Sequence, residues 1–176
     1  TSAVRNSNNG NEFANEVLIK TGINISIISG ETEAEYIYKG ARSATEFGKS
    51  PVLLVDIGGG STEFIICNES QIFWKQSFEI GLMRLFEKFH TNDLISDKEI
   101  KSIEDYLAFQ LEPLFIAVKK YEINDLIGSA GLFTSFAKII ELRFNNNKSL
   151  IKTSEYIFDI NQFQDIHNYL IQTRLD

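Results

Sequence analysis

The chain has 176 residues, of which 43% are hydrophobic, and carries a formal net charge of −7. This length and apolar content suffice for one domain, or parts of two, with a buried core. The negative charge argues against nucleic-acid binding, which requires clustered Lys and Arg side chains. No apolar run approaches the roughly 20 residues that span a bilayer, so no membrane partner is expected.

Two further features concern the cellular compartment. The single cysteine, Cys67, excludes a disulfide within the chain and is expected to be a small core residue at the end of a strand. No basic, apolar leader precedes the first residues, so a cytoplasmic location is the expectation.

The first fifty residues predict two helices and two short strands. We expect a strand end over 1–4, an Asn-rich loop, and a helix over 12–20. Alternation of Ile with polar residues over 23–28 predicts a strand. Ser29 and Gly30 open a helix that runs to about residue 47. The inward residues of the first helix are expected to be Phe13, Val17 and Leu18, and those of the second Ala34, Ile37, Tyr38, Ala41 and Thr45. The best candidate for a domain boundary is 48–51.

The segment VLLVDIGGGSTEFIIC, residues 52–67, combines two apolar runs with a glycine-rich turn. The runs predict two buried strands. Gly58, Gly59 and Gly60 would let the backbone enter positive φ, so that successive N–H groups converge on an anion. Ser61 and Thr62 add hydroxyl donors. The turn therefore predicts a phosphate-binding loop.

Carboxylates stand at both ends of this turn. Asp56 and Glu63 offer hard oxygen ligands, and they would repel a bound phosphate unless a cation such as Mg²⁺ lay between. A plain glycine hairpin is the alternative, but three glycines are more than a turn needs. No Lys follows the glycines and the next element is a strand, which disfavours a P-loop and a Rossmann fold.

Strands and helices alternate through the rest of the chain. Ile72, Trp74 and Phe78 are expected on one strand face, Ser96 and Glu99 form a capping box, and Pro113 should end or kink a helix. Further strands are expected over 71–78, 125–128 and 154–160, further helices after Gly81, after Ser96, over 132–144 and over 161–171, and a polar loop over 145–148. This pattern predicts an α/β fold with a mixed sheet and flanking helices.

Three motifs in order carry a family resemblance. DIGGGSTE, preceded by SGETEAEYIYKG (29–40) and TSAVRNSNNGNEF (1–13), resembles the exopolyphosphatase and guanosine pentaphosphate phosphatase family of the actin, sugar kinase and Hsp70 superfamily. The resemblance implies a ribonuclease H-like, actin-like domain over 50–176. It also implies that 1–49 is the C-terminal part of a preceding, similar domain, and that both ends of the chain are truncated.

Glu33 is the leading candidate for a catalytic base. It lies in the first turn of a predicted helix, where the helix dipole stabilises a carboxylate as the anion. Helical geometry separates it from Glu31 and Glu35. The resemblance implies that the Glu before Ala34 activates water.

The resemblance also assigns binding roles. It implies that Asp56 and Glu63 are metal-linked carboxylates and that Gly58, Gly59, Gly60 and Ser61 form the second phosphate loop. Arg5 resembles the family's phosphate-contacting Arg, whose guanidinium can grip two oxygens at once.

The implied function is Mg²⁺-dependent hydrolysis of the terminal phosphate of inorganic polyphosphate or of guanosine pentaphosphate. One alternative is an ATP-dependent, kinase-like member of the superfamily, although the match of GSAGLF (128–133) to a nucleoside pocket is weak. Another is a non-catalytic phosphate or alarmone sensor. The 176 residues by themselves are expected to be weakly active or inactive, and a homodimer is left open.

Overall fold

The structure, a computed structural model, describes residues 1–90, 94–144 and 155–173. The strands are β1 Val52–Ile57, β2 Thr62–Cys67, β3 Ile72–Phe78 and β4 Leu126–Ser129. The helices of the described residues are α1 Ser2–Asn6, α2 Gly10–Thr21, α3 Gly30–Ala44, α4 Leu82–Phe89, α5 Asp97–Gln110, α6 Glu112–Tyr121, α7 Gly131–Phe144 and α8 Ile160–Leu170.

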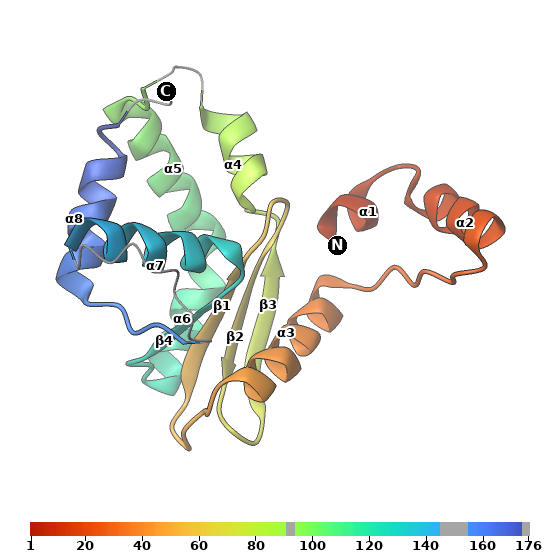
Figure 1. The fold of residues 1–176 in the computed structure, drawn as a ribbon, viewed down its shortest axis with the longest axis horizontal. Coiled ribbons are helices and arrows are strands. Elements are labelled where there is room, and N and C mark those ends of the chain that lie inside the picture. The colour runs from red at the N-terminus through yellow and green to blue at the C-terminus, as the bar shows by residue number, and fades with distance from the viewer. Residues whose placement is uncertain (91–93, 145–154, 174–176) are drawn as a thin grey trace.

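The four strands form one mixed sheet in the order β3-β2-β1-β4. β1 is antiparallel to β2, and β2 to β3, whereas β1 and β4 are parallel. A parallel pair requires a crossover, which the intervening strands and helices supply. Figure 1 shows α3 on one side of the sheet and α5 and α6 on the other, while α1 and α2 extend away from the helices that cover it.

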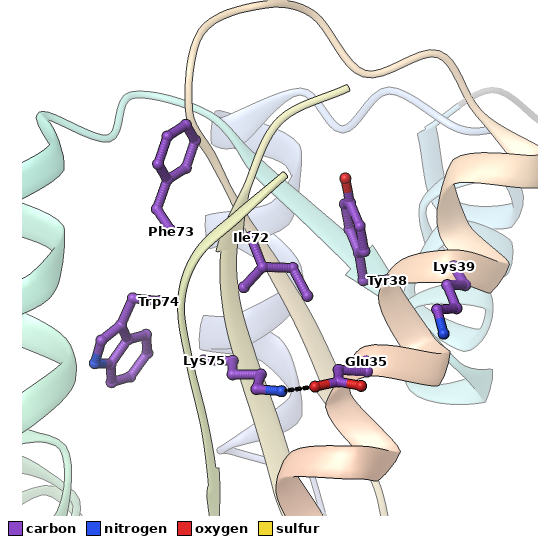
Figure 2. A pocket seen from close by; sticks show the side chains of 7 residues that line it. All are labelled: Glu35, Tyr38, Lys39, Ile72, Phe73, Trp74 and Lys75. Carbon is purple, nitrogen blue, oxygen red and sulfur yellow. Dashed lines mark hydrogen bonds and ion pairs between the residues drawn. The ribbon is translucent and has the colours of Figure 1, made fainter. Parts of the chain in front are cut away.

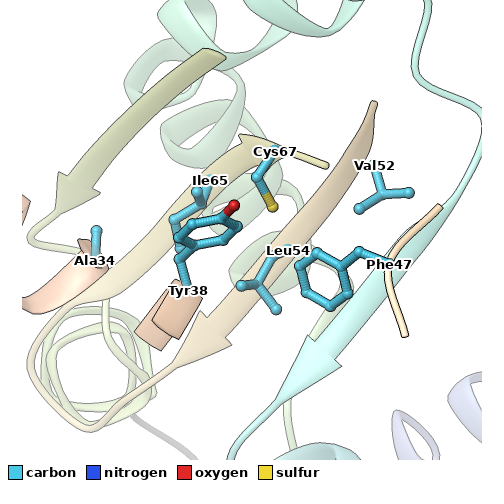
Figure 3. Packing of buried hydrophobic residues seen from close by; sticks show 7 residues of the cluster. All are labelled: Ala34, Tyr38, Phe47, Val52, Leu54, Ile65 and Cys67. Atoms are coloured by element: carbon cyan, nitrogen blue, oxygen red, sulfur yellow. The ribbon is translucent and has the colours of Figure 1, made fainter. Parts of the chain in front are cut away.

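The sheet face toward α3 is covered by a compact apolar core. Leu54 of β1 and Ile65 of β2 are fully buried there, beneath Ala34 and Tyr38 of α3. Cys67 is fully buried, which confirms the prediction of a core cysteine. Burial raises the pKa of its thiol to about 12. Figure 3 shows this cluster, formed by Ala34, Tyr38, Phe47, Val52, Leu54, Ile65 and Cys67.

The opposite face packs against α5 and α6. Its buried residues are Leu53, Val55, Ile66, Phe78, Ile80, Leu114 and Ala117. The predicted helix signals are confirmed here: Ser96 and Glu99 form a capping box at the start of α5. Pro113 lies in the first turn of α6, so α5 ends at Gln110. Because β1 is covered on both faces, its sequence is a continuous apolar run.

Several of the predicted strands are absent from the described structure. Residues 1–4 do not end a strand, because 2–6 form α1. Residues 23–28 are outside any strand, and among the described residues no other segment pairs with them. Residues 155–159 likewise form no strand, and 145–148 lie outside the described residues.

Two predicted faces also differ from the structure. Phe13 and Leu18 of α2 are 46% and 42% exposed rather than inward. Ile72 packs on the α3 side, whereas Trp74 and Phe78 pack on the other. The pairing of β2 with β3 shifts register next to Cys67, and this irregularity breaks the simple alternation.

Residues on both sides of the predicted boundary at 48–51 pack together. Ala34 and Phe47, which precede it, pack in one cluster with Leu54 and Ile65, which follow it. α3 is therefore part of the cover of this sheet. None of the helices in the described residues has the length and apolar content needed to cross a bilayer.

Ile65→Ala should test the core under α3. Ile65 is fully buried, so we expect its truncation to lower the free energy of unfolding by about 2–5 kcal/mol. Ile19→Ala, in a side chain that is 75% exposed, is the matched control and should cost less than about 0.5 kcal/mol. Urea unfolding of both variants measures the difference, and equal costs would contradict this packing.

Candidate active site

Four polar residues form one row across the sheet. Asp56 of β1 pairs in register with Glu63 of β2, and Glu63 with Ser77 of β3. On the other side, Asp56 pairs with Ser129 of β4. Residues that pair directly across strands share a face, so this polar row extends the α3-side core toward the strand ends.

Burial perturbs both carboxylates of the row. Burial raises the pKa of Asp56, and the negative charge of Glu33 raises it further. The hydrogen bond with Ser129 opposes this shift. Burial also raises the pKa of Glu63, whose hydrogen bonds with Ser77 and Ser61 oppose the shift. Ser77 Oγ donates to Glu63 Oε1 at 2.7 Å. Negative charge is therefore concentrated here, and this favours the binding of a cation or a proton.

α3 brings Glu33 to this row. Ser29 caps the helix by accepting a hydrogen bond from the Thr32 backbone N–H at 3.2 Å. Gly30 packs so closely on the row that an added Cβ would lie 2.4 Å from Ser77 Cβ. Glu33, in the first turn, is near enough to raise the pKa of Asp56 and of Glu63 through its charge.

Arg5 of α1 reaches the same place. Its Nη1 donates to Glu33 Oε2 at 2.7 Å, and its side chain is only 14% exposed. The other terminal nitrogen, Nη2, is buried and has no hydrogen-bond partner within the described residues. A buried guanidinium nitrogen without an acceptor is costly, so the arrangement favours an anionic ligand beside it.

The other two glutamates of α3 point elsewhere. Glu31 is exposed, and Glu35 forms an ion pair with Lys75. Figure 2 shows Glu35 and Lys75 in an open pocket of about 450 Å³, together with Tyr38, Lys39, Ile72, Phe73 and Trp74. This pocket shares no residue with the polar row, and we do not assign it to the candidate site.

The glycine loop is held by the start of α4. The backbone N–H groups of Leu82 and Met83, which have no partner within the helix, donate to the carbonyls of Gly58 and Gly59, each at 2.9 Å. The Gly60 carbonyl accepts from Arg84 Nε at 2.7 Å. Three consecutive loop carbonyls are thus fixed toward α4.

A trans peptide points its N–H away from its C=O. The N–H groups of Gly59, Gly60 and Ser61 belong to the same three peptides, so they face away from α4. Within the described part of the chain, none of these N–H groups donates to a protein acceptor. The loop therefore offers a run of backbone donors to an anion.

The predicted reason for the glycines is wrong. None of Gly58, Gly59 and Gly60 has a positive φ; the glycine with positive φ among the described residues is Gly22. At Gly60, and at Gly81 beside the loop, space is the requirement instead. A Cβ on Gly60 would lie 2.6 Å from Ser2 Oγ, and one on Gly81 would lie 2.4 Å from the Gly60 carbonyl carbon.

The fit of a metal ion depends on what completes its coordination. Among residues 1–90, 94–144 and 155–173, no group of three His, Cys, Asp or Glu side chains could hold a metal ion. Asp56 and Glu63 supply two neighbouring carboxylates, and Mg²⁺ sites commonly use one or two carboxylates plus substrate phosphates. Asp56 and Glu63 therefore fit Mg²⁺ only where substrate phosphates supply further ligands.

Ser77 and Ser129 were not among the sequence candidates. Each is a single serine within or at the end of a strand, and each contacts a carboxylate of the row. The strand register that aligns them with Asp56 and Glu63 could have identified them, but the sequence does not give that register.

Gly81→Ala and Gly59→Ala should differ in their effect on the free energy of unfolding, because Gly81 is crowded by loop backbone and Gly59 is not. An added Cβ at Gly81 meets loop backbone, so we expect a loss of about 1–3 kcal/mol in the free energy of unfolding. At Gly59 the nearest atom is Met83 Cγ at 3.6 Å, an ordinary contact, so the loss should stay below about 0.5 kcal/mol. Urea unfolding compares them, and equal stability would refute the close approach of Gly81.

Asp56→Asn should increase stability at neutral pH. Because burial raises the folded-state pKa of Asp56, the folded protein binds more protons than the unfolded chain between the two pKa values. Stability therefore falls as pH rises through that window, and Asn avoids the loss. We expect a higher melting temperature for the variant at pH of about 7 without divalent cations, with the difference shrinking toward pH of about 4. A variant less stable than wild type at neutral pH would contradict this.

Comparisons with known proteins agree with this fold. Among solved structures, an exopolyphosphatase from Cytophaga hutchinsonii is 33% identical with a TM-score of 0.90, and the match covers 97% of this chain and 55% of that one. A bifunctional 3-dehydroquinate synthase/phosphatase of Fusobacterium nucleatum is 37% identical over 145 residues, 80% of this chain and 22% of the relative. Exopolyphosphatase 2 of Mycobacterium tuberculosis is 30% identical over 115 residues, 65% of this chain and 36% of the relative.

This chain thus spans about half of the solved exopolyphosphatase and a smaller share of the two other relatives. The structural match confirms the predicted α/β class, an actin-like, ribonuclease H-like domain with a mixed sheet and flanking helices. A model of the Ppx/GppA phosphatase family matches residues 1–175, and the chain belongs to this family.

Proposed function

We propose that this chain forms one wall of the active site of a phosphohydrolase that releases terminal phosphate from inorganic polyphosphate. Guanosine pentaphosphate, which also ends in a phosphoanhydride, is the second substrate that the family name suggests. Relatives of this chain from Cytophaga hutchinsonii and Mycobacterium tuberculosis are named exopolyphosphatases, which favours polyphosphate.

The observation that carries this proposal is Nη2 of Arg5, which has no hydrogen-bond partner within the described residues. It is buried near Gly30 of α3, and Gly30 packs against Ser77 of the polar row. Phosphate oxygens are acceptors, and a guanidinium can bind two of them in parallel. In our proposal Arg5 binds one phosphate of the substrate, while the N–H groups of Gly59, Gly60 and Ser61 bind the next.

Glu33 is the proposed general base. Its ion pair with Arg5 orients the carboxylate before substrate arrives. In our proposal a phosphate draws the guanidinium toward its own oxygens, and Glu33 then accepts a proton from the water that attacks the terminal phosphorus. The bond from that phosphorus to the bridging oxygen breaks, and the shortened polyphosphate leaves.

Asp56 and Glu63 are the proposed ligands of a divalent cation, with Mg²⁺ as the first choice. Glu63 is 2% exposed and already accepts hydrogen bonds from two serines, so Asp56 is the more accessible of the two. When bound, Mg²⁺ would neutralise charge on the phosphate oxygens. The two carboxylates would hold the cation.

We also propose that 1–49 belongs to a first ribonuclease H-like domain and 50–176 to a second one. The extended residues 23–28 alternate Ile with polar residues and have no strand partner in the described structure. Ile19, near the end of α2, is 75% exposed, and Ile23, the first residue of the extended segment, is 61% exposed. In this proposal the substrate lies between the two domains, and α3 connects them while also covering one face of the sheet of the second domain.

Glu33→Gln, made in the full protein, should test the assigned base. Removing a positioned base should lower kcat for polyphosphate by about 10²–10⁴-fold, while Gln keeps the size of the side chain and so preserves substrate binding. The readout is phosphate release, combined with calorimetric titration of tripolyphosphate.

Glu31→Gln is the matched control, because Glu31 lies in the same helical turn but is exposed. It should leave kcat within about twofold of wild type, as surface substitutions usually do. An active Glu33→Gln protein would exclude Glu33 as the base. Absence of phosphate release from polyphosphate by the wild-type protein would reject the proposed activity itself.

A further inference from the structure

Glu79, in the connection between β3 and α4, joins two parts of the candidate phosphate site. Its Oε2 accepts a hydrogen bond from Asn6 Nδ2 of α1 at 2.6 Å. The same oxygen forms an ion pair with Arg84 Nη2 of α4 at 2.6 Å, and Ser2 Oγ lies 3.5 Å from it. A single carboxylate oxygen thus receives donors from two helices that are distant in the chain.

Each of these helices holds a binding element of the proposed site. α1 carries Arg5, whose Nη1 pairs with Glu33. Arg84, in α4, donates from Nε to the Gly60 carbonyl at 2.7 Å. Glu79 therefore lies between the residue that supplies the guanidinium and the residue that orients the loop.

In the described structure, α1 makes polar contacts with the segment around the loop through Ser2 and Asn6, and both contacts go to Glu79. Ser2 is buried against Gly60, where it fills the space that a side chain would take. α1 has only five residues, and it contacts the sheet domain through Ser2, Asn6 and Arg5. Its placement relative to the loop is therefore sensitive to the Asn6 contact with Glu79.

We infer that Glu79 is a positioning residue of the phosphate site, which fixes the spacing between Arg5 and the glycine loop. This inference rests on the proposed function in one respect, since it takes Arg5 and the loop to bind successive phosphates of one substrate. Glu79 itself touches neither substrate nor metal in this account. Two separate anion-binding elements act on a single polyanion only when their spacing is held, and small displacements weaken such sites strongly.

The exposure of this cluster makes the inference testable. The Glu79 and Arg84 side chains are 50% and 43% exposed, so their ion pair contributes little to global stability. Removing the carboxylate should leave the core of the sheet intact, because Glu79 belongs to neither buried cluster. Any large effect on substrate affinity would then reflect the spacing of the site.

Glu79→Ala in the full protein, assayed by steady-state hydrolysis of polyphosphate, provides the test. We expect KM to rise about tenfold and kcat to stay within about threefold, because Glu33, Asp56 and Glu63 lie on elements that Glu79 does not contact. Glu79→Gln keeps an acceptor oxygen for Asn6, so its KM should rise by only about threefold. Glu87→Ala, which removes an exposed carboxylate of the same region, is the control and should behave as wild type.

Asn6→Ala approaches the same contact from α1. It should raise KM to a similar extent, and the double variant Asn6→Ala/Glu79→Ala should be no worse than Glu79→Ala, because each single change already removes the hydrogen bond between Asn6 and Glu79. Additive effects, or a KM for Glu79→Ala within twofold of that for Glu87→Ala, would overturn the inference.

Hydrogen exchange separates this inference from the proposed function. The backbone amide of Arg5, which donates to the Thr1 carbonyl at 3.0 Å, should exchange at least about tenfold faster in Glu79→Ala than in Glu87→Ala, while the amides of β1 and β2 stay protected. This result would support the anchoring of α1 even if the wild-type protein released no phosphate from polyphosphate. Unchanged exchange of the Arg5 amide would overturn it.

Discussion

The pairing register of β1 determines where the polar groups of the candidate site lie. Asp56 opposes Glu63 on one side and Ser129 on the other, and Ser77 extends the row through β3. A slip of one residue would turn Asp56 to the face that α5 and α6 cover. Leu54 and Ile65, buried under α3, prevent that slip, because it would also bring them out of their core. The same apolar packing that stabilises the sheet therefore sets the position of the carboxylates.

The loop and the row differ in how they are built. The loop is shaped by backbone geometry: Leu82, Met83 and Arg84 hold its carbonyls, and its N–H groups turn outward as a result. In the row, strand pairing keeps the Asp56 and Glu63 carboxylates close together despite their like charge. Burial raises the pKa of both carboxylates. A site with outward donors and crowded carboxylates is stabilised when a phosphate and a cation bind together. This complementarity connects the buried carboxylates of the site to its proposed chemistry.

The sequence predicted local features well and distant contacts poorly. The strands around the glycine loop, the capping box at Ser96 and the break at Pro113 depend on neighbouring residues, and each is present. Residues 23–28 have a strand pattern without a strand, since pairing needs a second chain segment that the described residues do not supply. The loop glycines were predicted for positive φ, but at Gly60 the close approach of Ser2 shows that space is the requirement, and Ser2 lies far away in the sequence. Resemblance to a family, more than spacing, drew attention to Arg5, which lies 28 residues from its partner Glu33.

The account depends most on Arg5 as a receptor for phosphate, and calorimetric titration of tripolyphosphate into Arg5→Gln and wild-type protein tests it directly. Gln keeps a hydrogen-bond donor but loses the charge and the second terminal nitrogen that is buried without a partner. We predict that the dissociation constant rises at least about tenfold in Mg²⁺, equivalent to about 1.4 kcal/mol, while the melting temperature changes little. Equal affinity of the two proteins for tripolyphosphate would contradict the account, because the unpartnered nitrogen of Arg5 would then have no role in binding the anion.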